Sequence, residues 1–249
     1  MNPWLTILFF FSSSANLACA LAVRGQRVGL LDADVYGPSI PTLLGLPPDR
    51  PDVDESTPPL MIPPPAHGIV AQSMGFLVDP GAPIVWRGLM VMSALEQLLF
   101  KTAWGDLDFL LVDMPPGTGD AQLTLTQRVT VNGALIVSTP QEMALVDARR
   151  AIAMFDEVRV PIVGLVENMA STACPACGTV SDIFGSGGVQ AEADKAKIDF
   201  LASIPLAAAV RRMSDAGTPL AARPGAEETA EAAPYFAIAD TLLRKYPTL

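Results

Sequence analysis

The sequence predicts an α/β fold in which helices cover both faces of a doubly wound, mostly parallel sheet. One observation is a series of short runs that are apolar throughout, as expected for strands buried on both faces. The other is that helical segments alternate with these runs. The predicted strands span residues 27–31, 109–112, 134–137 and 161–166, and the predicted helices span residues 15–24, 89–100, 122–128, 141–155 and 189–197.

Capping and turn-forming residues set the limits of the remaining segments. The first helix is expected to start near Ser14, a good N-cap residue, and to end at Gly25, which suits a left-handed terminator. Residues 36–65 are rich in proline, which predicts a long surface loop without regular structure. Residues 226–244 are typical of a closing surface helix. We therefore expect residues 1–249 to form a single domain.

Composition excludes some classes of partner. The chain carries 16 Lys and Arg against 26 Asp and Glu, a net charge of -10, without a basic stripe. Nucleic acid is therefore not an expected partner. The three cysteines, Cys19, Cys174 and Cys177, are too few for a disulfide framework and favour a reducing compartment. We expect a cytoplasmic protein, with the mitochondrial matrix as the alternative.

The first residues resemble a signal peptide in part. An apolar run at residues 4–11 is followed by serines and then by small residues. No Lys or Arg precedes the run, and it is shorter than the roughly 20 residues of a membrane span. Neither export nor a membrane partner is therefore expected.

Two of the predicted strands are followed or closed by aspartate. Asp34 comes soon after the strand at 27–31, and Asp113 ends the strand at 109–112 and precedes a Gly-rich turn at 114–120. Ligands bind beyond the carboxyl ends of parallel strands, where a carboxylate and a flexible backbone suit a magnesium nucleotide. For one such element alone, a strand-to-helix turn with a capping aspartate remains the alternative.

Five longer strings closely resemble the Mrp family of MinD-like P-loop nucleotide-binding proteins. The similarity extends from about Ser12 to the C-terminus. The strings are Leu-Leu-Asp-Ala-Asp-Val-Tyr-Gly-Pro-Ser (30–39), Val-Trp-Arg-Gly-Leu-Met (85–90), Val-Asp-Met-Pro-Pro-Gly-Thr-Gly-Asp (112–120), Val-Ser-Thr-Pro-Gln (137–141) and Glu-Asn-Met (167–169).

This resemblance implies roles for four residues, with ATP and magnesium as the cofactors. Asp34 would orient or deprotonate the attacking water, Asp113 would be the Walker B aspartate near magnesium, and Gly117 would lie in the second switch. Asn168 would read the adenine edge through its paired amide donor and acceptor. Without the resemblance, Asn168 is equally a polar residue that ends a strand.

Cys174 and Cys177 form a Cys-x-x-Cys in a loop at residues 170–180. Two thiolates can hold one side of a metal, but His67, the only histidine, belongs to the proline-rich loop, so no four-ligand site is complete locally. Spacing leaves three interpretations open: half of an iron–sulfur site, a redox dithiol, and half of a zinc site. Cys19 is interpreted as a small core residue.

The Mrp resemblance favours the iron–sulfur interpretation of this cysteine pair. It implies a homodimer in which two chains share a four-iron cluster through Cys174 and Cys177. It also implies that the cluster is passed to apo iron–sulfur proteins.

One departure from the family concerns nucleotide binding. The family has Lys-Gly-Gly-Val-Gly-Lys-Ser-Thr before the helix matched at 15–22, but this chain has no glycine or lysine before Arg24 and Gly25. Residues 1–12 are thus degenerate, and contacts to the β- and γ-phosphates are expected to be missing. A truncated or wrongly started gene product is one explanation, and a natural member that has abandoned ATP hydrolysis is the other.

The sequence therefore predicts a cluster carrier on an ATP-binding scaffold whose phosphate loop is absent. The alternative is an ATP-hydrolysing enzyme of the same superfamily that retains ATP binding. A MinD-like positioning or membrane ATPase is disfavoured by the cysteine pair and by the lack of a basic amphipathic tail.

Overall fold

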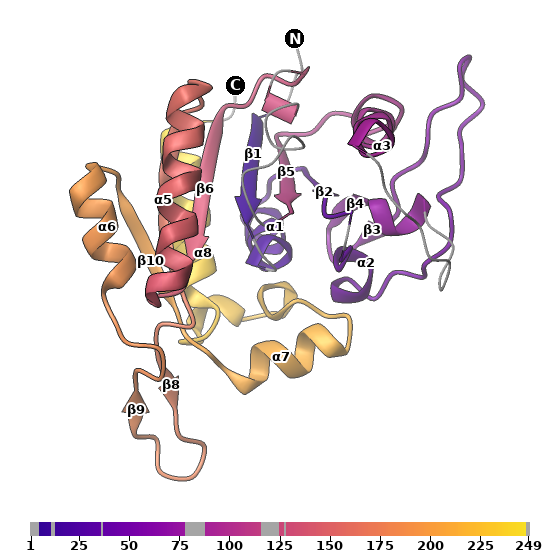
Figure 1. Cartoon of the computed structure of the whole chain (residues 1–249). Helices are drawn as coiled ribbons and strands as arrows, with labels where there is room; N and C mark the ends of the chain where they lie inside the picture. The colour runs from indigo at the N-terminus through magenta and orange to yellow at the C-terminus, as the bar shows by residue number, and fades with distance from the viewer. Residues whose placement is uncertain are drawn as a thin grey trace.

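The computed structural model describes residues 5–10, 13–35, 37–77, 88–115, 125–126 and 128–247. In this part of the chain, strands and helices alternate around a central sheet (Figure 1). The strands are β1 (Leu5–Phe10), β2 (Val28–Asp32), β3 (Pro65–Ala66), β4 (Ile69–Ser73), β5 (Phe109–Met114), β6 (Gly133–Ser138), β7 (Ile162–Asn168), β8 (Thr172–Ala173), β9 (Val180–Ser181) and β10 (Phe200–Ile204). The helices are α1 (Ser13–Val23), α2 (Ile40–Leu43), α3 (Gly88–Phe100), α5 (Glu142–Glu157), α6 (Gly188–Ala196), α7 (Ala208–Asp215) and α8 (Ala233–Lys245), with 3-10 turns η1 (Met74–Leu77), η2 (Leu220–Ala222) and η3 (Ala226–Glu228).

The described residues form an eight-stranded sheet in the order β10-β7-β6-β1-β5-β2-β4-β3. Neighbouring strands run parallel except β3, which is antiparallel to β4 at one edge. β1 lies in the middle, between β6 and β5, and leads towards α1 (Figure 1). The predicted fold class, a doubly wound α/β protein, is confirmed.

Both faces of the sheet are covered, which explains the continuous apolar runs. On β5, Phe109 and Leu111 point into a core formed with α1 and α8, while Leu110 and Val112 point into a second core formed with α3, α5 and α6. Successive side chains of a strand point to opposite faces, so a strand buried on both sides is apolar at every position.

Most of the predicted elements are confirmed, with small shifts of their ends. The strands predicted at 27–31, 109–112, 134–137 and 161–166 are β2, β5, β6 and β7, and the helices predicted at 15–24, 89–100, 141–155 and 189–197 are α1, α3, α5 and α6. The helix predicted at 122–128 falls mostly outside the described residues. Ser14 is not the N-cap of α1, because the helix already begins at Ser13.

Six strands of the described residues were not predicted. The two-residue strands β3, β8 and β9 are too short to leave a sequence pattern, and the other three were missed for different physical reasons. The signal-like run at 4–11 contains β1, whose position at the centre of the sheet follows only from pairing with β5 and β6. β4 carries Gln72 in an otherwise apolar segment, which hid its strand pattern. β10 is an edge strand and is only partly buried, so its sequence lacks a strong apolar signal.

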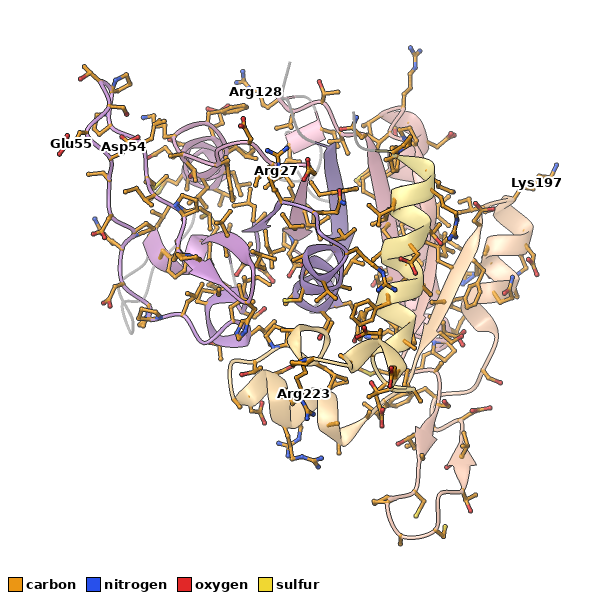
Figure 2. All side chains as sticks on the ribbon, turned by 180° about the vertical axis from the view of Figure 1, so that it is seen from behind. Arg27, Asp54, Glu55, Arg128, Lys197 and Arg223 are labelled. Carbon is orange, nitrogen blue, oxygen red and sulfur yellow. The ribbon has the colours of Figure 1, made fainter. Side chains whose placement is uncertain are left out.

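The expectation of no regular structure in 36–65 was wrong in part. The short helix α2 has Pro41 in its first turn, where the missing amide of proline costs little. Further along, Val53 bridges Met61, and the Asp54 carboxylate accepts hydrogen bonds from the amides of residues 56 and 60 at 3.1 and 2.8 Å. Figure 2 shows Asp54 and Glu55 at the outer end of this loop. The Asp54 side chain thus supplies hydrogen bonds that hold the turn at residues 54–60, where the backbone forms no regular strand pairing.

The C-terminal helix differs from the predicted surface helix at 226–244. Residues 226–228 form η3, and α8 begins only at Ala233. One face of α8 is buried in the core that it shares with α1, through Tyr235, Phe236, Ile238, Ala239 and Leu242. The segment is therefore part of the core that supports α1.

Candidate functional site

The predicted carboxylates gather at the carboxyl edge of the sheet. β2 and β5 are neighbours, and their register places Asp32 opposite Asp113. Asp34 follows two residues after Asp32, where the chain leaves β2. The topology therefore brings together the two aspartates that the sequence singled out, and it adds a third.

That third residue, Asp32, organises the start of the loop. Its carboxylate is fully buried and accepts hydrogen bonds from the amides of Asp34 and Ile40, both at 3.1 Å, and from the Ser73 hydroxyl at 2.9 Å. It thereby joins β2, the first turn of α2 and the end of β4. Asp32 was not among the predicted site residues, although it ends β2 and is the first member of the Asp-x-Asp string.

The environment of Asp113 disfavours the charged form of its carboxyl group more strongly than that of Asp32. Its side chain is 5% exposed, and its Oδ1 and the Ser14 Oγ are buried without a hydrogen-bond partner in the described part of the chain. Burial first, and then the neighbouring charges of Asp32 and Asp34, raise the pKa of Asp113 well above its ordinary value. The nearby Ser14 hydroxyl offsets part of this rise, although the two groups do not make a hydrogen bond of normal geometry.

A buried carboxylate oxygen without a hydrogen-bond partner, beside a hydroxyl, fits a hydrated magnesium ion, since magnesium takes oxygen ligands and keeps several waters. The phosphate side of the same site is known only from the sequence. Only Phe11 and Ser12 connect β1 to α1, and neither a glycine nor a lysine lies in the sequence up to Val23. The absence of a phosphate-binding loop therefore stays a prediction beside the carboxylates that the structure describes.

The crowded carboxylates make a prediction about pH. Burial raises the pKa of Asp32 from 3.8 to about 6, so between these values the folded chain binds more protons than the unfolded chain. The free energy of unfolding must then fall as pH rises through this interval, by about 3 kcal/mol for Asp32 at about 1.4 kcal/mol per pKa unit. Asp113 acts in the same direction because its pKa is raised too. Urea denaturation at pH 4 to 8 measures this fall.

Asp113→Asn is the informative variant for this prediction. It removes one of the mutually repelling charges, so the loss of stability with rising pH should become shallower, and the variant should be more stable than the parent chain at pH 8. Asp199→Asn, at an exposed ion pair with Lys245, serves as the control. Parallel pH profiles for the parent and Asp113→Asn would show that the buried charges are compensated.

Asn168 and Gly117 complete the nucleotide residues that the resemblance implied. Asn168 ends β7 opposite Ile204 of β10, and its Oδ1 accepts a hydrogen bond at 3.0 Å from the amide of Met169, which has a positive φ of 56°. Asn168 thus lies at the carboxyl edge, as expected, while its side chain also supports the turn that follows. Gly117 lies outside the described residues.

Glu167 is a second residue that sequence analysis missed. Its side chain is 2% exposed, and its two carboxylate oxygens accept hydrogen bonds from the amides of Gly187 at 3.3 Å and Val189 at 3.1 Å. A carboxylate is favourable at the N-terminus of α6 because the helix dipole is positive there. Glu167 therefore closes the base of the excursion between β7 and α6. The available signal was an acidic residue inside an apolar strand.

The cysteine loop is a small hairpin formed by β8 and β9, which projects from the body on the side of the carboxyl ends (Figure 1). The amide of Cys174 donates to the Thr179 carbonyl at 2.9 Å, and the amide of Gly178 donates to the Cys174 carbonyl at 2.8 Å. Gly178 has a positive φ of 73°, which glycine adopts without strain. The predicted loop at 170–180 is thus an ordered turn that presents both thiols.

Thr179 sets the environment of one of these thiols. Cys177 is exposed, and its Sγ is hydrogen bonded to the Thr179 Oγ1 at 3.2 Å. The Thr179 hydroxyl first, then the Thr179 amide and Cys174, hold the pKa of the Cys177 thiol below its ordinary value. Cys19 differs, because burial in the core raises its pKa to about 12. The prediction that Cys19 is a core residue is confirmed.

The described residues contain no group of three or more His, Cys, Asp or Glu side chains arranged to hold a metal ion. Cys174 and Cys177 are therefore two thiols without a third metal-binding side chain beside them in that part of the chain. Two adjacent thiols, one exposed and one half-buried, suit half of a shared metal site or a dithiol. A complete tetrahedral site would need ligands from elsewhere.

The parallel sheet, the central strand leading to α1 and the aspartates at the carboxyl edge define a MinD-like P-loop NTPase fold. MinD from Pyrococcus furiosus superimposes with a TM-score of 0.67 at 19% identity over 96% of this chain and 99% of that one. A nucleotide-binding protein from Archaeoglobus fulgidus, solved in complex with ADP, gives a TM-score of 0.76 at 36% identity over 93% and 91% of the two chains.

Within this class, the chain belongs to the NUBPL iron-transfer P-loop NTPases of the ParA group, whose family model matches residues 12–243. An iron–sulfur cluster carrier protein from Salmonella typhimurium is 49% identical over 220 residues, which are 88% of this chain and 59% of that protein. The iron–sulfur cluster transfer protein NUBPL from Mus musculus is 47% identical over 237 residues, or 94% and 72% of the two chains. The chain thus spans 59% of the length of its Salmonella relative.

None of the helices in the described ranges is both long enough and apolar enough to cross a bilayer.

Proposed function

We propose that this chain carries an iron–sulfur cluster and passes the cluster to apo iron–sulfur proteins. The observation that carries the proposal is the projecting hairpin with two adjacent thiols, the half-buried Cys174 and the exposed Cys177. The family and the names of the Salmonella and mouse relatives support a cluster as the cargo, in preference to a redox dithiol or a zinc half-site.

Two copies are needed to complete the site in this proposal. Cluster irons are usually held by four thiolates, and each chain presents two on its hairpin. A two-fold axis through the turn supplies the other pair, so a homodimer holds one four-iron cluster. Release is then a ligand exchange: thiolates of the recipient replace the sulfurs of Cys174 and Cys177, and no electron transfer is required.

In this proposal the nucleotide fold serves mainly as a scaffold. Asp113 would support magnesium, Asp34 the attacking water and Asn168 the adenine, but the phosphate contacts are the weak part of the site. The Archaeoglobus relative binds ADP, and the carboxylates at the edge of the sheet favour an ATP-hydrolysing enzyme as the second candidate function.

The compartment follows from the cargo and from the relatives. All three cysteines are free, and exposed thiol ligands persist in reducing compartments. The relatives include bacterial proteins and a mitochondrial protein of Arabidopsis thaliana that is 50% identical over 210 residues. We propose the bacterial cytoplasm, or the mitochondrial matrix, as the place of action.

Anaerobic reconstitution with iron and sulfide tests the carrier function directly. The expected result is about two irons and about two sulfides per chain, as a four-iron cluster shared by two chains requires. A parallel ATP titration on the same sample should show weak binding. Absence of bound iron, together with tight ATP binding, would overturn the proposal in favour of the ATP-hydrolysing enzyme.

Thr179→Val tests the support of the cluster ligand. Once Cys177 is a metal-bound thiolate, the Thr179 hydroxyl can donate to its sulfur, and valine removes that donor with little change of shape. Iron should be lost to a chelator roughly tenfold faster than from the parent chain, since outer partners of metal ligands commonly contribute this much. Thr179→Ser retains the donor and should behave like the parent. Equal rates for all three would contradict the role of the hydroxyl.

A further inference from the structure

The hairpin presents apolar side chains as well as thiols to the surroundings. Val180 is 64% exposed and Ile183 is 60% exposed, and neither belongs to either core of the described chain. Val180 pairs with Ala173, the residue before Cys174, so it lies next to the thiols. The apolar surface and the cysteine pair are therefore parts of one structure, which we call the cysteine hairpin (residues 169–187).

The cysteine hairpin has few internal interactions that would stabilise it while these apolar side chains are exposed. Its two strands contain two residues each, and a hairpin of that size is marginally stable alone. It projects from the body in both opposite views (Figures 1 and 2), and its residues 171–187 contribute to neither hydrophobic core. Its order comes from the Glu167 contacts and from the Leu206 amide, which donates to the Ser171 carbonyl at 2.7 Å. Covering Val180 and Ile183 would stabilise the projecting part.

Charge indicates what covers this surface. The chain has a net charge of -10, yet Asp182 is the only charged residue between Met169 and Gly187. A partner recognised by its charge would find almost nothing to pair with there. A second copy is different, because the mutual repulsion of two strongly acidic chains is smallest where they meet through a surface that is almost free of charge. An isologous contact also places both cysteine pairs near the two-fold axis.

We propose that Val180 and Ile183 form the apolar contact through which a second copy of this chain docks around the four thiols. This inference rests on the proposed cluster-carrying function. It adds that the dimer is held by a protein contact as well as by the metal, since burial of apolar side chains on both copies favours association independently of the cluster.

The test compares two matched double variants after anaerobic reconstitution. Val180→Ser with Ile183→Ser removes the proposed contact, whereas Val53→Ser with Ile62→Ser changes the same residue types, 60% and 44% exposed, on the proline-rich loop. Sedimentation equilibrium should give a dimer dissociation constant roughly tenfold or more higher for the hairpin variant, and an unchanged constant for the control. Ile183→Ser alone should give a smaller change in the same direction.

The possible outcomes separate the contact from the function. Iron binding by the parent chain, with the same dimer affinity for both double variants, would overturn the contact and leave the carrier function standing. A hairpin variant that dimerises and loads normally but transfers its cluster slowly would assign the surface to the recipient and would also overturn the proposal. A parent chain that binds no iron removes the function and the contact together. Circular dichroism confirms that each variant is folded.

Discussion

A chain in which both Cys174 and Cys177 are replaced by serine is expected to bind no iron after anaerobic reconstitution, against about two irons per parent chain. Serine hydroxyls are not deprotonated at neutral pH and are poor ligands for cluster iron, which is held by thiolates. Both side chains lie at the surface of the hairpin, so the stability of the monomer should change by less than about 0.5 kcal/mol. Iron and sulfide analysis, with a thermal melt of the apo-protein, measures both effects.

Cys19→Ala is the matched control for this experiment. Cys19 lies on α1 and is buried in the hydrophobic core, whereas Cys174 and Cys177 lie on the projecting hairpin. Alanine is small enough to replace Cys19 with a limited loss of packing. This variant should load iron like the parent chain but melt at a lower temperature. Unchanged iron content in the double serine variant would eliminate the hairpin as the cluster site. Loss of iron in the alanine variant would show that iron content falls whenever the fold is destabilised, whichever cysteine is replaced.

The second large effect concerns ATP. Replacing Phe11 and Ser12, which connect β1 to α1, by Lys-Gly-Gly-Val-Gly-Lys-Ser-Thr is expected to raise ATP affinity at least about 100-fold. Hydrogen bonds to charged groups contribute about 1.5–3 kcal/mol each, so two restored phosphate contacts already give about 3 kcal/mol. Asp113 and Asn168 would then act together with the inserted loop. Isothermal titration with ATP and magnesium measures the gain.

Two further variants show whether the restored site works as proposed. Changing the second lysine of the inserted string to alanine should return the affinity close to that of the parent chain, because this lysine neutralises the β- and γ-phosphates. Asn168→Ala in the inserted chain should reduce the preference for ATP over GTP. Tight ATP binding by the parent chain itself would contradict the prediction that this chain makes few contacts to the phosphates of ATP.

Local pattern was sufficient for the strands whose environment is uniform. β5, β6 and β7 are buried on both faces, so their sequences are apolar at every position and could be identified without knowledge of their neighbours. β1 shows the limit of this approach. Its run is apolar too, but a signal peptide has the same local pattern, and only the pairing of β1 with β5 and β6 distinguishes the two. Composition alone contains no information about that pairing.

The roles of the candidate site residues stay predictions, and only their positions can be compared with the structure. Asp34, Asp113 and Asn168 were singled out because they lie at or just after the ends of apolar strands, and the cysteine pair because of its spacing. Asp32 and Glu167 were missed, since their importance depends on distant partners: Ser73 contacts Asp32 across 41 positions, and Val189 contacts Glu167 across 22. A pattern of neighbouring residues does not show which amide or hydroxyl will face a carboxylate after folding.

The sequence by itself determined the α/β class, the aspartates at or near strand ends, the presence of a Cys-x-x-Cys pair and the family resemblance, because each is recorded in the order of neighbouring residues. The tertiary structure alone decided that Asp32, Asp34 and Asp113 share one crowded edge, that Glu167 closes the base of the cysteine hairpin, and that Val180 and Ile183 remain uncovered beside the thiols. The physical reason is that charge repulsion, hydrogen-bond satisfaction and exposure depend on which segments become neighbours, and the sheet order sets those neighbours.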